Sequence, residues 1–319
     1  MKDLFVGLDL GGTWLKYGVA GVDGKLLARG KKPSHGQESR EVIFGVMEEA
    51  VAEMKAATAD VGQLRAIGVG SPGIVDYEQG KLVGGAPNLP HWEGADIRGE
   101  LGRRTGLKVY ADNDANVMAL AETRLGAGRG ARNAIFLTLG TGIGGGILID
   151  GELYRGSWFA GAELGHVPIK FDGRKCNCGN VGCIEQYASA PGIIQTYREL
   201  CEAAGRTCPD EVTTEHIFGV ADEDKEAAET IRLTAYYLGV ALSGFTNVFN
   251  PEVIVIGGGV AEAGDAFIRK VEDETKKLAM RESASRLRVV RAQMGNEAGT
   301  VGAILLAAEG YAKEKEGRA

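Results

Sequence analysis

The sequence lacks several features that would place it in a membrane, in a secretory pathway or on nucleic acid. No window of its 319 residues approaches the ~20 uninterrupted apolar residues that a membrane helix requires. Positive charge is not in excess, because the formal net charge is −7, and this argues against a broad basic face for nucleic acid. The chain begins MKDLFVGLDLGG, without a charged leader, a long apolar run and a cleavage site, so no signal peptide is expected. We therefore expect a cytoplasmic protein.

The chain also has no linker or low-complexity segment, and its length favours two domains over one. What it has in excess is glycine, with 49 residues. Glycine gathers at the ends of three apolar, β-branched runs, in residues 4–30, 134–156 and 252–260. The composition is otherwise that of an ordinary globular protein.

The first two glycine-rich segments resemble each other. Each has a strand that ends in Leu-Gly, a short turn with a threonine (Thr13 or Thr141), and a second extended run. Each then closes through an Asp-Gly pair, at 23–24 and 150–151, which is a strong hairpin signal. The repeat predicts two related domains that face one another, although two unrelated β-meanders with the same turns would give the same pattern.

Helical patterns alternate with the strands. Residues 40–59 carry apolar residues at three-to-four spacing, which predicts an amphipathic helix. Residues 227–250 are more continuously apolar and end at Asn250-Pro251, before the strand VIVI. Residues 299–317 predict a last helix with a charged tail. The overall pattern is α/β with hairpins.

Glycine loops bring backbone N–H groups close to a ligand, and such groups suit phosphate oxygens. A Walker P-loop is absent from the sequence. Residues 140–145 match G-x-G-x-x-G, but the following GILIDGELY predicts a strand and a hairpin where a dinucleotide fingerprint needs a helix. What remains is a strand–glycine loop–strand unit that occurs twice, with an acid, Asp9, in the first strand.

A second acidic position lies in VYADNDANVMALAE (109–122), a strand that leads through a polar corner into a helix. In phosphoryl transfer a hydroxyl nucleophile benefits from a carboxylate that accepts its proton. Asp114 is the candidate for this role, with Asn113 beside it. Helix N-capping explains the same residues, and Asp112 fits capping or a supporting role better than catalysis. Asn88 and Gly73 lie in loops that could contact a ligand or have no such role.

Cysteine is clustered in CNCGNVGCIEQ (176–186). An odd number of cysteines cannot all pair, Cys-x-Cys spacing makes a local disulfide awkward, and disulfides are rare in the cytosol. His166 in AELGH precedes the cluster, and three thiolates with one imidazole form a recognised tetrahedral zinc set. Three unconnected surface thiols are the competing interpretation. The proposed ligands are His166, Cys176, Cys178 and Cys183, whereas Cys201 and Cys208 are expected to have no ligand role.

Together these motifs resemble those of the ROK family (repressors, open reading frames and sugar kinases), within the actin-like ATPase and sugar-kinase superfamily. DLGGT and LGTGIGGG look like its two phosphate loops, and Gly257–Gly259 matches its adenosine-side loop, although a tight strand-to-helix turn would look the same. C-x-C-G-x-x-G-C-x-E is matched at every specified position, and NLPHW, NDAN and VIVIGGG extend the resemblance over residues 6–302. One departure is Ala162, where the residue before the glutamate of E-x-G-H is commonly glycine.

The resemblance implies an actin-like ATPase, ribonuclease H-like α/β fold with two domains around a central cleft. Residues 1–117 plus 299–319 would form the smaller domain and residues 118–298 the larger one, which carries the zinc loop. Asp114 would be the base for the 6-hydroxyl of a hexose. The sugar pocket would be lined by Gly73, Asn88, Asn113, Asp114, Glu163, His166 and Glu185. The nucleotide would be held by Asp9, Gly11, Gly12, Thr13, Lys16, Gly140, Thr141, Gly142, Gly257, Gly258 and Gly259, with Asp9 near Mg²⁺ through water.

The implied activity is ATP-dependent phosphorylation of a hexose, most like that of the family's glucokinases, in carbohydrate metabolism and glycolysis. N-acetylglucosamine, N-acetylmannosamine, mannose and fructose are alternative substrates, and a non-catalytic sugar sensor is a further alternative. The family's repressors carry an N-terminal helix-turn-helix segment, for which the first strand near Leu4 leaves no room. Mg²⁺ and a structural Zn²⁺ are the implied cofactors, ATP and a hexose the implied ligands, and a homodimer or tetramer the implied assembly, with no nucleic-acid or membrane partner.

Overall fold

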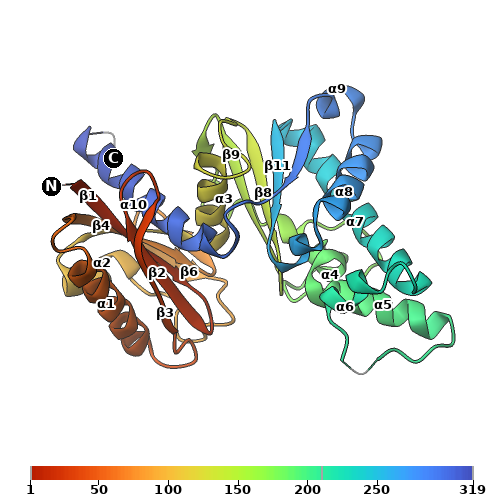
Figure 1. The fold of residues 1–319 in the computed structure, drawn as a ribbon, viewed down its shortest axis with the longest axis horizontal. Coiled ribbons are helices and arrows are strands. Elements are labelled where there is room, and N and C mark those ends of the chain that lie inside the picture. The colour runs from red at the N-terminus through yellow and green to blue at the C-terminus, as the bar shows by residue number, and fades with distance from the viewer. Residues whose placement is uncertain (1, 210, 318–319) are drawn as a thin grey trace. The chain divides into compact units, whose positions relative to one another are not determined.

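The computed structural model describes residues 2–209 and 211–317. Unit 1 comprises Met1–Leu125, Arg155–Gly161 and Asn296–Ala319, and unit 2 comprises Gly126–Tyr154 and Ala162–Gly295. Both units are α/β (Figure 1). The boundary predicted between residues 117 and 118 lies inside the helix α3 (Asp114–Arg124), whereas the first segment of unit 1 continues past the end of that helix to Leu125.

Unit 1 carries a five-stranded sheet in the order β3-β2-β1-β4-β7. β1 and β3 pair antiparallel with β2, whereas β4 pairs parallel with both β1 and β7. A small hairpin of β5 and β6 follows β4. The elements of unit 1 are β1 (Lys2–Leu10), β2 (Trp14–Ala20), β3 (Leu26–Pro33), α1 (Arg40–Ala57), β4 (Gly62–Ser71), β5 (Ile74–Asp76), β6 (Lys81–Gly84), α2 (Ile97–Thr105), β7 (Lys108–Asn113), α3 (Asp114–Arg124) and α10 (Ala298–Lys315).

The sheet of unit 2 has the equivalent order, β10-β9-β8-β11-β12, again with antiparallel pairs first and parallel pairs last. The repeat predicted from the two glycine-rich segments is therefore present as two sheets of one topology. The elements of unit 2 are β8 (Ala134–Leu139), β9 (Ile143–Ile149), β10 (Glu152–Leu153), η1 (Leu164–His166), α4 (Glu185–Ala188), α5 (Ala190–Ala203), α6 (Thr214–Gly219), α7 (Lys225–Phe249), β11 (Val253–Gly257), η2 (Gly259–Ala263), α8 (Asp265–Leu278), α9 (Arg281–Ala284) and β12 (Arg288–Arg291), and a short turn, η3 (Gly295–Glu297), precedes α10.

Successive side chains of a strand point to opposite faces of a sheet, so the position of each residue in β1 determines the face of the unit 1 sheet on which its side chain lies. Val6 and Leu8 of β1 join a buried cluster with Ile43 and Met47 of α1. Gly7 faces α10, and a Cβ there would come within 2.2 Å of the Thr300 carbonyl oxygen. Asp9 therefore belongs to the face that α10 covers, and it reaches the end of the strand beside the first glycine loop.

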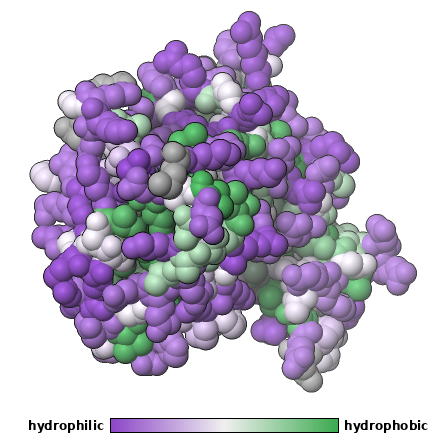
Figure 2. Space-filling model, turned by 60° about the vertical axis from the view of Figure 1, so that its left-hand side comes forward, coloured by the Kyte–Doolittle hydropathy of each residue, from purple (hydrophilic) through white to green (hydrophobic). Residues whose placement is uncertain are grey.

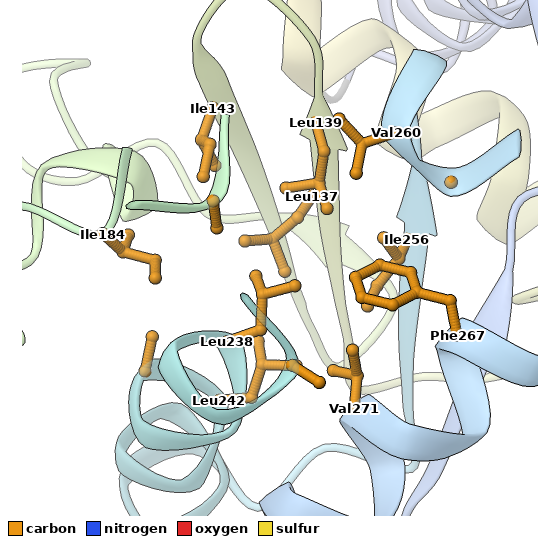
Figure 3. Packing of buried hydrophobic residues seen from close by; sticks show 14 of the residues in the cluster. Leu137, Leu139, Ile143, Ile184, Leu238, Leu242, Ile256, Val260, Phe267 and Val271 are labelled. Carbon is orange, nitrogen blue, oxygen red and sulfur yellow. The ribbon is translucent and has the colours of Figure 1, made fainter. Parts of the chain in front are cut away.

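The core of unit 2 lies between its sheet and two long helices. Leu137 of β8 and Ile256 of β11 pack against Leu238 of α7 and Phe267 of α8 (Figure 3). Ile184, at the end of the cysteine-rich loop, is fully buried in the same cluster. Burial of Ile184 therefore anchors this end of the cysteine-rich loop in the core of unit 2.

Turn chemistry matches the sequence. Asp150 and Gly151 both have positive φ, 53° and 87°, as a two-residue type I′ hairpin between β9 and β10 requires. Asn250 ends α7 in the left-handed region, with φ of 44°, and the three helices expected over 40–59, 227–250 and 299–317 are present as α1, α7 and α10.

The surface is mostly hydrophilic on the face drawn in Figure 2, where hydrophobic residues show only in small patches. Within residues 2–209 and 211–317, no helix has both the length and the apolar character needed to cross a membrane.

Candidate functional site

The acidic corner of unit 1 forms where β7 passes directly into α3. Asn113 is the helix cap, because its side-chain oxygen accepts hydrogen bonds from the backbone N–H groups of Ala115 (2.9 Å) and Asn116 (3.2 Å). Its amide nitrogen donates to the Gly73 carbonyl at 3.0 Å. Asp114 is the first residue inside the helix, and its half-buried carboxylate accepts from Ala115 N–H at 2.8 Å. Capping therefore accounts for Asn113, and the Asp114 carboxylate lies at the N-terminal end of the helix.

Gly73 is required by packing within this corner. Its φ is +91°, and a Cβ would come within 2.5 Å of the Gly84 carbonyl oxygen. Gly73 therefore packs closely against the β5–β6 hairpin, and the Gly73 carbonyl orients Asn113.

The first glycine loop connects β1 to β2. Gly11 N–H donates to the Trp14 carbonyl at 2.9 Å, and Gly12 packs against Asn88, whose Cβ would lie 3.1 Å from a Cβ at position 12. Thr13 and Asn88 are exposed. This arrangement puts the proline-bounded loop of Asn88 directly beside the first predicted phosphate loop.

Asp9 lies just before that loop, opposite Lys16 in the strand register. Burial raises the pKa of the Asp9 carboxyl, and the positive charge of Lys16 opposes the shift. A Cβ at Gly299, in the first turn of α10, would come within 2.4 Å of the Asp9 carboxyl group. The carboxylate oxygens of Asp9 are hard ligands of the kind that Mg²⁺ takes, whereas the Lys16 charge and the N-terminus of α10 add positive potential beside them.

The second glycine loop connects β8 to β9 in unit 2. Gly140 N–H donates to the Gly142 carbonyl at 2.9 Å, and Thr141 is exposed. The Glu185 carboxylate accepts from Ile143 N–H at 2.9 Å, and a Cβ on Gly142 would come within 2.7 Å of that carboxylate. Glu185 thus holds the end of the glycine loop in place.

The third glycine segment follows β11. Gly258 has φ of +84°, and a Cβ there would come within 2.3 Å of the Leu139 carbonyl oxygen, so this turn packs against the start of the second glycine loop. Gly259 has open space around its Cα and borders a cavity of about 320 Å³. The cavity is lined by Thr214, Glu215, Phe218, Gly219, Gly259, Val260, Glu262 and Ala263.

The cysteine-rich loop brings its four predicted ligands together. The ligand atoms of His166, Cys176, Cys178 and Cys183 all lie within 4.8 Å of one another. His166 Nδ1 lies 3.6 Å from Cys176 Sγ, and Cys178 Sγ lies 3.7 Å from Cys183 Sγ. Tetrahedral ligands of zinc are about 3.3–3.8 Å apart, given Zn–N and Zn–S bonds of about 2.0–2.3 Å. The donors therefore fit a zinc ion, whereas a disulfide would need sulfur atoms about 2.05 Å apart.

Two glycines shape this loop. Gly179 has φ of +90° and Gly182 has φ of +76°, and a Cβ on Gly182 would collide with the Lys170 carbonyl. Burial raises the pKa of the Cys183 thiol to about 12, whereas a hydrogen bond from the Asn180 backbone lowers the pKa of exposed Cys178. Metal binding would require both sulfurs as thiolates.

Glu163 immediately precedes η1, the short turn that carries His166. Partial desolvation raises the pKa of the Glu163 carboxyl, the charge of Glu185 acts in the same direction, and His166 opposes it. Ala162 has φ of +66°, a left-handed conformation that favours glycine. The departure noted in the sequence therefore lies at a position where the backbone conformation is costly for alanine.

Arg174 is a residue that the sequence motifs did not identify. Its guanidinium donates to the carbonyls of Gln186 (2.6 Å) and Gly192 (3.0 Å) and to Glu199 (2.6 Å). It thus ties the start of the cysteine-rich loop to α5. Nothing in the spacing of one arginine predicts such contacts, because the partners lie in later elements.

Known proteins resemble the chain over almost its whole length. The model of the ROK family matches residues 5–310. A glucokinase from Thermotoga maritima is 35% identical over 308 residues, which cover 93% of this chain and 95% of the relative. A xylose repressor from Caldicellulosiruptor bescii is 30% identical over 279 residues, which cover 84% of this chain and 69% of the relative.

Solved structures share the fold. A ROK hexokinase from Thermus thermophilus superposes with a TM-score of 0.83 at 34% identity, covering 98% of this chain and 99% of that one. A ROK family glucokinase from Streptomyces griseus, solved with glucose and AMPPNP, gives a TM-score of 0.80 at 32% identity, covering 96% and 99%. These matches confirm the predicted actin-like fold, and the chain belongs to the ROK family.

Proposed function

We propose that this chain is an ATP-dependent sugar kinase that phosphorylates the 6-hydroxyl of a hexose, with glucose as the first candidate substrate. The observation that carries the proposal is the corner at Asn113 and Asp114. Asn113 caps the helix, and the Asp114 carboxylate lies at the helix N-terminus. Similarity to a glucokinase solved with glucose and AMPPNP supports both ligands.

Asp114 is the proposed general base. The sugar hydroxyl oxygen would form a bond to the γ-phosphorus as the bond to the ADP oxygen breaks, and the hydroxyl proton would pass to the Asp114 carboxylate. Asn113 and Asn88 would contact sugar hydroxyls, and Gly73 would contribute by holding the Asn113 amide in place.

The glycine loops are the proposed phosphate contacts. Backbone N–H groups of Gly12, Thr13, Thr141 and Gly142 would hold the phosphates, because those of Gly11 and Gly140 donate within their own loops, and the Lys16 ammonium would add positive charge. The cavity beside Gly259 would take the adenosine. Asp9 would hold Mg²⁺ through water, and Mg²⁺ would supply neutralising charge for the phosphate oxygens.

The cysteine-rich loop is the proposed zinc site, and its role is structural. The Cys₃His set would supply all four ligands of a tetrahedral zinc ion, which would leave no open position for catalysis. Residues 164–184, which include all four proposed zinc ligands, connect Glu163 to Glu185, and Glu185 follows buried Ile184. We propose that Glu163, His166 and Glu185 supply the sugar contacts of unit 2, and that zinc fixes their spacing.

A coupled assay of ADP release with purified protein tests the function directly. The panel should contain glucose, mannose, fructose, N-acetylglucosamine and N-acetylmannosamine, each with ATP and MgCl₂. We expect sugar-dependent ADP release that is fastest with glucose. Binding of a sugar without turnover of any panel member would instead establish a sensor, and faster turnover of an amino sugar would replace glucose as the substrate.

A further inference from the structure

A buried ion pair lies directly behind the acidic corner. The Arg155 guanidinium donates to one carboxylate oxygen of Asp112, Oδ2, from Nε at 2.8 Å and from Nη2 at 2.6 Å. The Asp112 side chain is 1% exposed and that of Arg155 is 18% exposed. A buried carboxylate of this kind needs a partner, because an unpaired charge away from water is strongly unfavourable.

The other carboxylate oxygen of Asp112 serves the corner itself. Oδ1 accepts from Asn113 N–H at 2.8 Å and from the Asn116 side-chain amide at 2.9 Å. These two residues are the cap of α3 and a member of its first turn, and Asp114 lies between them in the chain. Asp112 therefore connects the arginine on one side to the turn that carries the proposed base on the other.

Arg155 is itself held from two directions. Its guanidinium stacks over the Tyr77 ring at 3.9 Å, in the turn that connects β5 to β6. Gly73, whose carbonyl accepts from Asn113, immediately precedes β5. Its carbonyl oxygen accepts from Gly161 N–H at 2.8 Å, which closes the segment Arg155–Gly161 into a loop within unit 1. These two contacts hold Arg155 in place independently of its ion pair with Asp112.

We propose that Arg155 is a positioning residue for phosphoryl transfer, acting through Asp112 to fix the Asn113–Asp114 turn against the sugar hydroxyl. This inference rests on the proposed kinase function. A displacement of about 1 Å in a reacting group can cost ~10²-fold in rate, so loss of the arginine should lower kcat about 10- to 100-fold. Sugar affinity should fall less than kcat, because Asn113 is only one of the proposed sugar contacts, whereas proton transfer depends entirely on the placement of Asp114.

The test compares Arg155→Gln, Arg155→Lys, Asp112→Asn and the Arg155→Gln/Asp112→Asn double variant, with kcat, KM, sugar affinity by calorimetry and Tm measured for each. The best hexose of the panel is the probe. Arg104→Gln is the matched control, because Arg104 is a 10% exposed arginine of the same unit that pairs with Glu41 and Glu100, away from the corner. We expect it to lower Tm and leave kcat within twofold.

Arg155→Gln should lower both Tm and kcat, with a smaller fall in sugar affinity than in kcat, and Arg155→Lys should recover part of kcat. The double variant leaves no buried unpaired carboxylate, so we expect Tm to recover while kcat stays at the level of Arg155→Gln. A double variant that regains both Tm and kcat would show that only folding was affected and would overturn the inference, as would a wild-type kcat in folded Arg155→Gln. If the wild-type chain turns over no sugar at all, the proposed kinase function fails first, and that outcome is distinct from the other two.

Discussion

Gly142 is the position where the second glycine loop is most sensitive to a single methyl group. A Cβ there would come within 2.7 Å of Glu185 Oε2, the oxygen that accepts from Ile143 N–H. Gly142→Ala should therefore displace the Glu185 carboxylate and break a charged hydrogen bond. Such a bond contributes about 1.5–3 kcal/mol, which for a domain of this size corresponds to a fall in Tm of roughly 3–12 °C.

Gly140→Ala is the internal control, because a Cβ on Gly140 meets no atom within 4 Å. We expect this variant to keep the wild-type Tm but to raise KM for ATP, since the added methyl group stands where backbone N–H groups should approach phosphate. Thermal unfolding followed by circular dichroism gives the Tm values, and steady-state kinetics give KM. Equal Tm values for Gly142→Ala and the wild type would refute the idea that Glu185 holds the loop.

Three further predictions concern the zinc loop, a strained residue and acid stability. Cys178→Ala should lose bound zinc and weaken sugar affinity, whereas Cys208→Ala should keep the zinc, and metal analysis by mass spectrometry measures both. Unchanged sugar affinity in zinc-free Cys178→Ala would contradict the structural role proposed for zinc. Ala162→Gly should leave Tm equal or higher, although Ala→Gly elsewhere usually lowers it, because relief of a left-handed alanine offsets the added entropy of the unfolded chain; a clear fall in Tm would be the contrary result. Hydrogen bonds from Arg206 lower the pKa of Asp224, so the contribution of Asp224 to the free energy of unfolding should be complete above the ordinary aspartate pKa of about 3.9 and be lost as the pH falls below it. Denaturant unfolding between pH 7 and pH 3 should therefore show a smaller acid-induced loss of unfolding free energy for Asp224→Asn than for the wild type. An identical pH dependence of the two proteins would contradict the assignment.

Local spacing was sufficient to predict the parts of the site that are built from neighbouring residues. The cysteines and His166 lie close in sequence, and the two glycines between them allow the turns that bring the ligands together. The antiparallel part of each sheet also matches the repeated strand–loop–hairpin pattern, whereas that pattern does not give the order of the parallel strands. At Ala162 the sequence identified the position where the structure has a costly backbone conformation.

Contacts between distant segments could not be predicted in this way. Glu185 accepts from Ile143 N–H across 42 positions of sequence, and Arg155 contacts Asp112 across 43. Such pairs depend on how elements pack, and the residue types alone do not select them. The same limit applied to Asn113 and Asp114, since either residue type can cap a helix and only the hydrogen bonds assign the cap to Asn113.

The most direct test of the proposed function is the turnover of Asp114→Asn with the best hexose and saturating ATP, measured beside sugar binding by calorimetry. If Asp114 accepts the hydroxyl proton, kcat should fall at least ~10²-fold while sugar affinity stays within about twofold, because asparagine keeps the size and hydrogen-bonding reach of the side chain. Turnover close to that of the wild type would contradict the assignment of the base and, with it, the mechanism proposed for this chain.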